Sequence, residues 1–288
     1  MAYLWTVTAL WAFSFSLIGE FLSGQVDSYF AVMSRVLLAV LVFLPWMVRH
    51  PPRSSLALQL MGIGAIQLGL MYLFYYRSFL LLSVPEVLIF TIFTPVYVTL
   101  IHDLLSRRFH PGYVLSALLA VIGAAIIRYD QPGGDIWRGF LIVQASNVCF
   151  AAGQVLYKYL QAKHPAAHQH HHFGWFFVGA TLVTVPAWLL FGQADYPDQP
   201  TQWAVILWLG LVASGAGYFL WNYGASKVDS GNLAVMNNAV IPAGLLVNLL
   251  LWNQDANVLR LTAGTGVLVV ALWINRWWSR SSPQSSLS

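Results

Sequence analysis

The sequence predicts an all-α membrane protein in which ten transmembrane helices form two inverted five-helix repeats. Three observations lead to this prediction. Apolar runs of about 16–22 residues, almost free of charge, recur from Tyr3 to Trp278, and at about 1.5 Å per residue each run can cross the hydrocarbon core of a bilayer. The chain is 58% hydrophobic and 8% charged, whereas a soluble domain carries about 25% charged residues. The two halves of the chain also resemble each other weakly.

The first five predicted spans fill the first half of the chain. In order, they are Tyr3–Leu22, Tyr29–Val48, Leu56–Tyr76, Val84–Leu105 and Gly112–Ile127. The first span is long enough to cross the bilayer and no charged segment precedes it, so we expect a helix rather than a cleaved signal. Pro51 and Pro52 separate the second span from the third, and Pro111 precedes the fifth. Pro95 should kink or locally break the fourth.

The second half holds the other five predicted spans. They are Ile136–Tyr157, Phe173–Phe191, Trp203–Asn222, Gly231–Trp252 and Leu261–Trp277. A connection of about 15 residues that is rich in histidine follows Lys158, and Pro242 should kink or break the ninth span. We therefore divide the chain into a first repeat at 1–130, a second repeat at 131–280 and a disordered Ser-rich tail at 281–288.

The internal repeat is clearest where Tyr72–Pro95 aligns without a gap on Phe219–Pro242. Both segments combine an aromatic-rich helix end, a short polar turn and a helix that carries a proline. Because each half has an odd number of spans, the second half must have the opposite orientation in the membrane. Inverted repeats place a binding site near the midplane, at the interface between the two halves.

Lysine and arginine gather in alternate connections. With the N-terminus in the cytoplasm, the inner connections and the C-terminal end hold nine of these residues and the outer connections hold three. The inner nine are Arg49, Arg53, Arg107, Arg108, Lys158, Lys163, Lys227, Arg276 and Arg280, and the outer three are Arg128, Arg138 and Arg260. This bias follows the positive-inside rule and predicts that both termini are cytoplasmic.

Three charged residues lie within the predicted spans or at their ends. Arg35 lies inside the second span, Arg77 at the outer end of the third and Glu86 at the start of the fourth. Charge in a bilayer is costly and indicates function by default, although Arg77 and Glu86 could be interfacial and Arg35 could tie helices together. In the functional interpretation an arginine binds a carboxylate substrate, and Glu86 is its counter-charge or a proton site. Arg77 is our first candidate and Arg35 our second.

Polar and aromatic residues also share single faces of several spans. Buried amides without partners are expensive in lipid, so these faces should point toward one another or toward a solute. A single amide more often holds helices together, but several of them with aromatic residues indicate the lining of a pocket. The remaining candidates are Phe93 and Tyr97 in the fourth span, Asn147 in the sixth, Trp221 and Asn222 in the eighth, and Asn237 and Asn238 in the ninth.

The sequence disfavours several other classes of protein. We find no phosphate-binding loop, so no nucleotide is expected, and the net charge of +4 gives no reason to expect nucleic acid. There is no nucleophile elbow and no zinc motif, so we expect neither an enzyme nor a cofactor or metal site. The histidine-rich run His168–His172 is interpreted as a solvated loop. The lipid bilayer is the one partner that composition itself requires.

Several segments resemble EamA-type proteins of the drug/metabolite transporter superfamily. These segments are YFAVMSRVLLAVLVFLPW, TPVYVTLI and SALLAVIGAAII. Longer strings, WAFSFSLIGEFLSGQVDSYFAV and ASGAGYFLWNYGASKVDSGNL, resemble the biotin-transporting branch of that superfamily, and the resemblance covers nearly the whole chain. It implies a secondary transporter of ten helices in two inverted repeats that imports biotin across the bacterial inner membrane.

Biotin also suits the candidate residues. Its carboxylate, apolar ring and ureido group are complementary to an arginine, an aromatic wall and several amides. An exporter of amino acids or related small metabolites with the same fold is the alternative. An integral-membrane enzyme ranks lower, because only Asp103 and Asp229 accompany the cytoplasmic histidines. Uniport, proton symport and exchange are all compatible with the sequence.

Overall fold

The computed structural model of the chain describes residues 1–52, 54–105, 135–165, 168–228 and 230–252, together with Gly266, Val270 and Trp273. In this part of the chain every regular element is a helix, and seven helices are long and apolar enough to cross a membrane. Met236–Trp252 forms a shorter apolar helix. The all-α prediction is confirmed for these residues. The predicted span Gly112–Ile127 and nearly all of Leu261–Trp277 lie outside them.

In the described part of the first half, two helices are continuous and two are interrupted. The continuous helices are α1 (Ala2–Phe21) and α2 (Ser28–Arg49). The third predicted span consists of α3 (Ser54–Gly64), the π-helix η1 (Ala65–Leu70) and α4 (Met71–Ser78). The fourth consists of α5 (Val84–Phe90), the 3₁₀ helix η2 (Thr91–Phe93) and α6 (Thr94–Leu105). This second interruption lies directly before Pro95, whose ring clashes with the preceding turn of a regular helix.

The second half begins with a long helix and also contains an interrupted one. Its elements are α8 (Asp135–Lys163), α9 (Gln169–His172), α10 (Gly174–Phe191), α11 (Pro200–Trp208), the π-helix η3 (Leu209–Ala216), α12 (Gly217–Ala225) and α13 (Ser230–Trp252). The predicted loop after Lys158 was wrong in part, because α8 continues to Lys163 and α9 is helical. No helix-breaking residue occurs in that stretch until Pro165, which disfavours a helical conformation of the residue before it.

Local sequence signals explain where several helices begin. The side chain of Asp27 accepts a hydrogen bond from the backbone N–H of Phe30 at 2.7 Å, and so caps the start of α2. Ser83 and Glu86 form a reciprocal capping box at the start of α5. Pro200 occupies the first turn of α11, where its missing N–H costs no hydrogen bond. These caps satisfy backbone groups that lipid could not.

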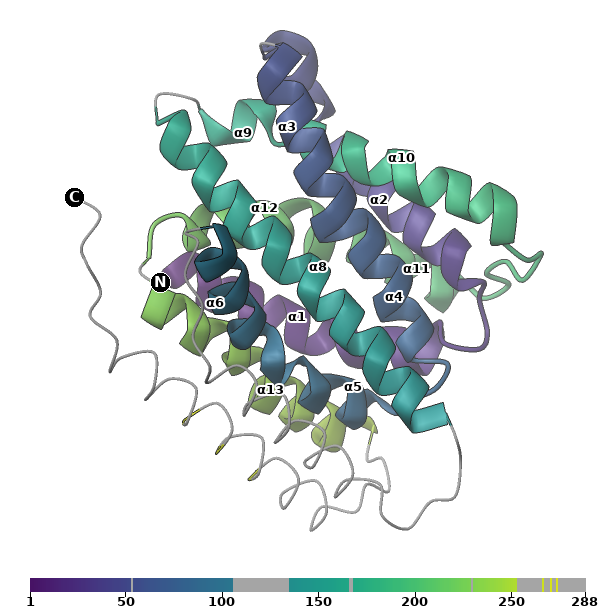
Figure 1. Ribbon diagram of the computed structural model, residues 1–288. Helices are drawn as coiled ribbons and strands as arrows, with labels where there is room; N and C mark the ends of the chain where they lie inside the picture. Colours follow the sequence, from purple (N-terminus) through teal and green to yellow (C-terminus); the bar gives the residue numbers. More distant parts are fainter. Residues whose placement is uncertain are drawn as a thin grey trace.

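The two halves interlock in a reciprocal way (Figure 1). Helix α1 packs against α13 and α12, and α8 of the second half packs against α6 and α4. Helix α2 packs against η3, and α10 packs against η1 and α3. Helices α2 and α10 also contact each other. Described helices of each half therefore pack against helices of the other half, and the centre of this part of the bundle lies between the two halves.

Each of the two π-helices among the described residues lies near the middle of a long helix, one in each half of the chain. A π-helical turn is wider than an α-helical turn, is rare, and frequently occurs at functional sites. η1 contacts α10 and α8, whereas η3 contacts α2 and α1. The widened turns thus lie where each half meets the other, and they change the direction in which the side chains of α4 and α12 point.

Glycine permits close contact between α3 and α10. A Cβ atom at Gly64 would meet the main-chain carbonyl oxygen of Phe176, and one at Gly179 would meet that of Met61. Because the obstructing atoms are backbone, a change of rotamer cannot relieve the clash. On the same helix, a Cβ at Gly62 would meet nothing within 4 Å.

The two glycines of α3 should therefore respond oppositely to alanine. Gly64→Ala should lower the free energy of unfolding by about 1–3 kcal/mol through overpacking. Gly62→Ala should leave it unchanged or raise it by up to about 1 kcal/mol, since alanine favours the helix. Thermal unfolding of the purified full chain in detergent measures both. Equal unfolding temperatures for the two variants would contradict the close contact.

Candidate functional site

A cavity of about 90 Å³ lies between the two halves of the chain. It is lined from α1, α2, α4, η2, α6, α8, α12 and α13, so each half contributes to its wall. The lining residues are Trp11, Ser14, Phe15, Ile18, Arg35, Met71, Tyr72, Tyr75, Thr91, Thr94, Ser146, Asn147, Phe150, Tyr218, Trp221, Asn237 and Val240. One cation, aromatic rings and small polar groups thus share one space.

Arg35 supplies the positive charge of the cavity wall. Its side chain is 2% exposed, its Nε donates to Ser214 Oγ at 2.8 Å, and its Nη1 donates to the Tyr76 hydroxyl at 3.0 Å. The guanidinium carbon lies 4.1 Å from the centre of the Tyr72 ring, within the range of a cation–π interaction. The hydroxyls of Tyr72 and Ser214 lie 2.9 Å apart and complete the network.

The partners of Arg35 are neutral. Within the described residues no carboxylate forms an ion pair with this guanidinium, and the one ion pair present joins His102 and Asp103. Glu20 and Glu86 belong to helix ends rather than to the cavity wall. A buried cation held only by hydroxyls and a ring is incompletely neutralised, and a carboxylate binds such a group more strongly than any neutral partner does.

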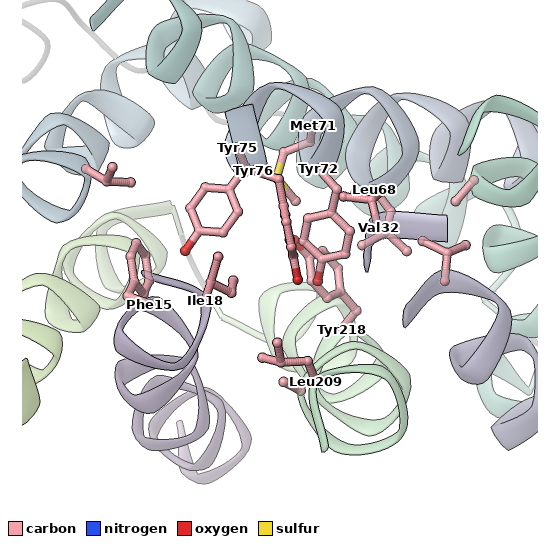
Figure 2. Packing of buried hydrophobic residues seen from close by; sticks show 14 of the residues in the cluster. Phe15, Ile18, Val32, Leu68, Met71, Tyr72, Tyr75, Tyr76, Leu209 and Tyr218 are labelled. Atoms are coloured by element: carbon pink, nitrogen blue, oxygen red, sulfur yellow. The ribbon is translucent and has the colours of Figure 1, made fainter. Parts of the chain in front are cut away.

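Aromatic side chains form the walls beside Arg35, and Figure 2 shows those of Tyr72, Tyr75, Tyr76 and Tyr218. Trp11 packs on Tyr218 and Trp221 with ring centroids 5.0 and 4.9 Å apart, and its Nε1 donates to the carbonyl of Ala213 at 3.0 Å. Tyr75 points from α4 toward α1, where its ring meets Phe15 edge to face at 5.4 Å. These rings present an apolar surface on which a flat or aliphatic ligand can lie.

Two asparagines contribute amide groups to the same cavity. Asn147 donates from Nδ2 to the carbonyl of Phe90 at 2.9 Å and to Gln144 Oε1 at 3.2 Å. Asn237 is 6% exposed, and neither its Nδ2 nor its Oδ1 has a hydrogen-bond partner in the part of the chain that the structure describes. An amide with both ends unsatisfied is costly in a low dielectric, so Asn237 is available for a polar ligand.

Of the candidates that the sequence offered, Arg35, Asn147, Trp221 and Asn237 line the cavity together. Trp221 is held there by a hydrogen bond of 2.8 Å from its Nε1 to Gln154 Oε1. These four residues come from four different helices. They lie between the two halves of the chain, where the sequence predicts a pocket, and their role in binding stays a prediction.

The other two charged candidates lie elsewhere. Arg77 is exposed, and its Nη1 donates to the Tyr29 hydroxyl at 2.6 Å. The Glu86 carboxylate accepts hydrogen bonds from the backbone N–H and the hydroxyl of Ser83 at 2.8 and 2.9 Å, as a helix cap does. Neither side chain lines the cavity.

The remaining candidates mostly connect helices. The Tyr97 hydroxyl donates to Gln144 Oε1 at 3.1 Å, and the Asn222 Oδ1 accepts from Gln67 Nε2 at 3.2 Å. Phe93 is buried in η2, and Asn238 lies beside Asn237 but outside the cavity lining. These contacts correspond to the alternative in which buried amides hold helices together.

Sequence reasoning passed over the residues that surround Arg35. Tyr72, Tyr76 and Ser214 hold the guanidinium in place, and Trp11 forms one wall. A usable signal was present for Trp11, because it lies in the middle of its span, whereas tryptophans that anchor a helix lie at the interface.

Three kinds of comparison place this chain among known proteins. The EamA-like transporter family matches residues 1–129 and 137–277. The chain is 55% identical over 278 residues to a probable biotin transporter of Pseudomonas aeruginosa, covering 96% of this chain and 97% of that protein. It is 52% identical over 289 residues to the biotin transporter of Escherichia coli K12, covering 99% and 95%. The chain also matches a protein of known crystal structure at 18% sequence identity. The match covers 98% of each chain with a TM-score of 0.66, which shows a shared fold.

The hydrogen bond from Arg35 to Tyr76 should contribute measurably to stability. Tyr76→Phe removes the acceptor and should lower the free energy of unfolding by about 1.5–3 kcal/mol, the range for a hydrogen bond to a charged group. Tyr75→Phe is the matched control, since the Tyr75 hydroxyl has no hydrogen bond among the described residues. Thermal unfolding of the purified variants compares the two. A larger loss in Tyr75→Phe than in Tyr76→Phe would exclude the network as described.

Proposed function

This chain belongs to the EamA-like transporter family, and from that premise we propose that it is a secondary transporter that imports biotin across the bacterial inner membrane. Relatives that are 51–55% identical over nearly the full chain carry the name biotin transporter. One feature of the cavity carries the proposal: Arg35, a buried cation without a carboxylate partner, lies next to aromatic walls. Biotin is a monocarboxylate with an apolar ring system, and it supplies the missing anion.

The composition of the cavity favours biotin over the alternative substrate class. An amino acid brings an ammonium group as well as a carboxylate, and the ammonium needs an acidic partner when it is buried. Among the lining residues there is a cation but no aspartate or glutamate. The site therefore suits a ligand with one negative charge and no positive charge, and export of amino acids is the weaker proposal.

The cavity is smaller than a typical ligand pocket. Its volume is about 90 Å³, whereas pockets for drug-sized ligands enclose about 300–1,000 Å³. We therefore take this conformation as a contracted one. Entry of biotin requires the helices around the cavity to separate, which is the kind of movement by which transporters of inverted repeats alternate access.

We further propose ten helices in two inverted repeats. The family matches two segments of similar length, 1–129 and 137–277. The α–π–α pattern recurs in the third and eighth spans, and the contacts of α1 and α2 are mirrored by those of α8 and α10. The boundary of the repeats at residue 130 and the tail at 281–288 belong to the same proposal.

Arg35 should determine affinity for the carboxylate. In Arg35→Ala, the apparent affinity for labelled biotin should fall roughly ten- to a hundred-fold, because a charged hydrogen bond is worth about 1.5–3 kcal/mol. Arg35→Lys should restore only part of the lost affinity, since the lysine ammonium is a point charge and cannot form the bidentate pair. Arg77→Ala, which removes an exposed arginine, is the matched control and should stay near wild type. If the affinity for biotin is unchanged in Arg35→Ala, with the variant verified in the membrane, the carboxylate binds elsewhere in the protein.

Uptake itself is tested in a strain that lacks both biotin synthesis and its own biotin transporter. The chain should restore growth at nanomolar biotin, a range that corresponds to about −12 kcal/mol of binding. Biotin methyl ester should compete poorly, because it lacks the anion. The absence of any growth advantage over the empty vector, with the protein present in the membrane, rejects biotin import.

The proposed orientation places both termini in the cytoplasm. A green fluorescent protein fused after Ser288 should fluoresce, because this reporter folds in the cytoplasm, and alkaline phosphatase fused at the same residue should be inactive. The reverse pattern contradicts the orientation that the lysine and arginine bias predicts.

A further inference from the structure

Asn237 is the most unusual polar residue of the cavity. Its Nδ2 and Oδ1 are both buried and both lack a partner, although nearly all buried polar groups in proteins are hydrogen-bonded. Asn237 lies on the wall of the cavity, and its two polar atoms are covered in this contracted conformation, so a ligand reaches them once the helices around the cavity separate. An unsatisfied donor and an unsatisfied acceptor on one planar group are complementary to another planar group that offers one of each.

Asn147 offers a second hydrogen-bond acceptor, and it lies near η2, the 3₁₀ turn of the fourth span. Its Nδ2 is occupied by Phe90 O and Gln144 Oε1, which fix the orientation of the side chain and leave Oδ1 without a donor among the described residues. Helices α8 and α13 both pack against η2, the 3₁₀ turn that interrupts the fourth span. The helices that carry Asn147 and Asn237 therefore flank this turn, and Thr91 and Thr94 add polar groups to the same cavity wall.

Asn237 and Arg35 lie at different depths in the bundle. Arg35 is seven residues from Ser28, the start of α2, which corresponds to about 10 Å from the end of the bundle where α1 ends. Asn237 is seven residues from Ser230, the start of α13, or about 10 Å from the opposite end. The rings of Phe21 and Trp252 meet at one end and those of Tyr3 and Tyr223 at the other, so these two ends are opposite.

We infer that Asn237, together with the Oδ1 of Asn147, forms a subsite for the ureido ring, and that the substrate lies along the bundle with its carboxylate on Arg35. A cyclic urea has one carbonyl between two N–H groups. Asn237 Nδ2 donates to that carbonyl, Asn237 Oδ1 accepts from one N–H, and Asn147 Oδ1 accepts from the other. The ring then points toward the end where α1 begins. This inference rests on the proposed transport of biotin and adds the group that provides specificity.

Competition with two analogues tests the ureido subsite. Desthiobiotin keeps the ureido ring and the carboxylate, whereas lipoic acid keeps the carboxylate, the aliphatic chain and a five-membered ring but has no urea. Uptake of labelled biotin is measured in the strain that lacks biotin synthesis and transport, with increasing amounts of each competitor. In the wild type, desthiobiotin should inhibit at a concentration at least ten-fold lower than lipoic acid does.

Substitution of Asn237 should remove this discrimination. Asn237→Leu keeps the number and branching of the side-chain heavy atoms but has no polar atom. It should weaken inhibition by desthiobiotin at least ten-fold, leave inhibition by lipoic acid unchanged, and bring the ratio of the two inhibitory concentrations close to one. Asn238→Ala, which alters the neighbouring amide outside the cavity, is the matched control and should keep the wild-type ratio. If Asn237→Leu does not reach the membrane, Asn237→Ser is measured in its place.

The outcomes separate the two proposals. No uptake of labelled biotin by the wild type rejects the proposed function. If the wild type takes up labelled biotin but lipoic acid competes as well as desthiobiotin does, the proposed function stands and the ureido subsite is overturned. An unchanged ratio in Asn237→Leu or in Asn237→Ser, at normal levels of the protein in the membrane, also overturns it.

Discussion

A polar group inside a lipid bilayer has no water to bind, and this constraint shapes the centre of the molecule. Arg35 meets it through two hydroxyls and an aromatic ring. These partners come from α4 and η3, so the arginine ties α2 to one helix of each half of the chain. The network gives hydrogen-bond acceptors to Nε and Nη1 of the guanidinium and leaves its positive charge without a carboxylate among the described residues. The candidate site thus rests on a structural requirement that is only partly met.

The interruptions of the helices put these groups in place. η1 lies just before α4, which carries Tyr72 and Tyr76, and η3 contains Ser214 itself. η2 lies between Phe90, whose carbonyl holds Asn147, and Pro95. In regular α-helices the same side chains would point in other directions, because a π or 3₁₀ turn changes the rotation between successive side chains. The π and 3₁₀ turns therefore set the direction of side chains around the cavity, whereas the glycines of α3 and α10 allow these two helices to pack closely at the periphery.

The sequence was sufficient to predict the helices but only part of the site. Apolar length placed Val84–Leu105 at the bounds that the structure has, and gave α1 and α2 within one residue. Arg77 was preferred over Arg35 because aromatic neighbours in sequence suggested a site, yet Tyr72 and Tyr76 point to Arg35 across the bundle. The direction of those rings depends on the π-helix before them, and no residue pattern available from one sequence indicates a π-helix. Asn222 and Asn237 look equivalent in sequence, and only packing shows that one amide is satisfied and the other is not.

The lone charge of Arg35 also makes the site sensitive to membrane voltage. An empty site carries one positive charge, and a site that holds a monocarboxylate is neutral. Moving one charge through the full potential involves about 2.3 kcal/mol per 100 mV. In a protein that alternates access around this site, a voltage that is negative inside therefore favours the inward-facing form of the empty protein and scarcely affects the loaded one. The return of the empty protein to the outward-facing form, rather than the movement of the loaded protein, is then the step that the voltage opposes.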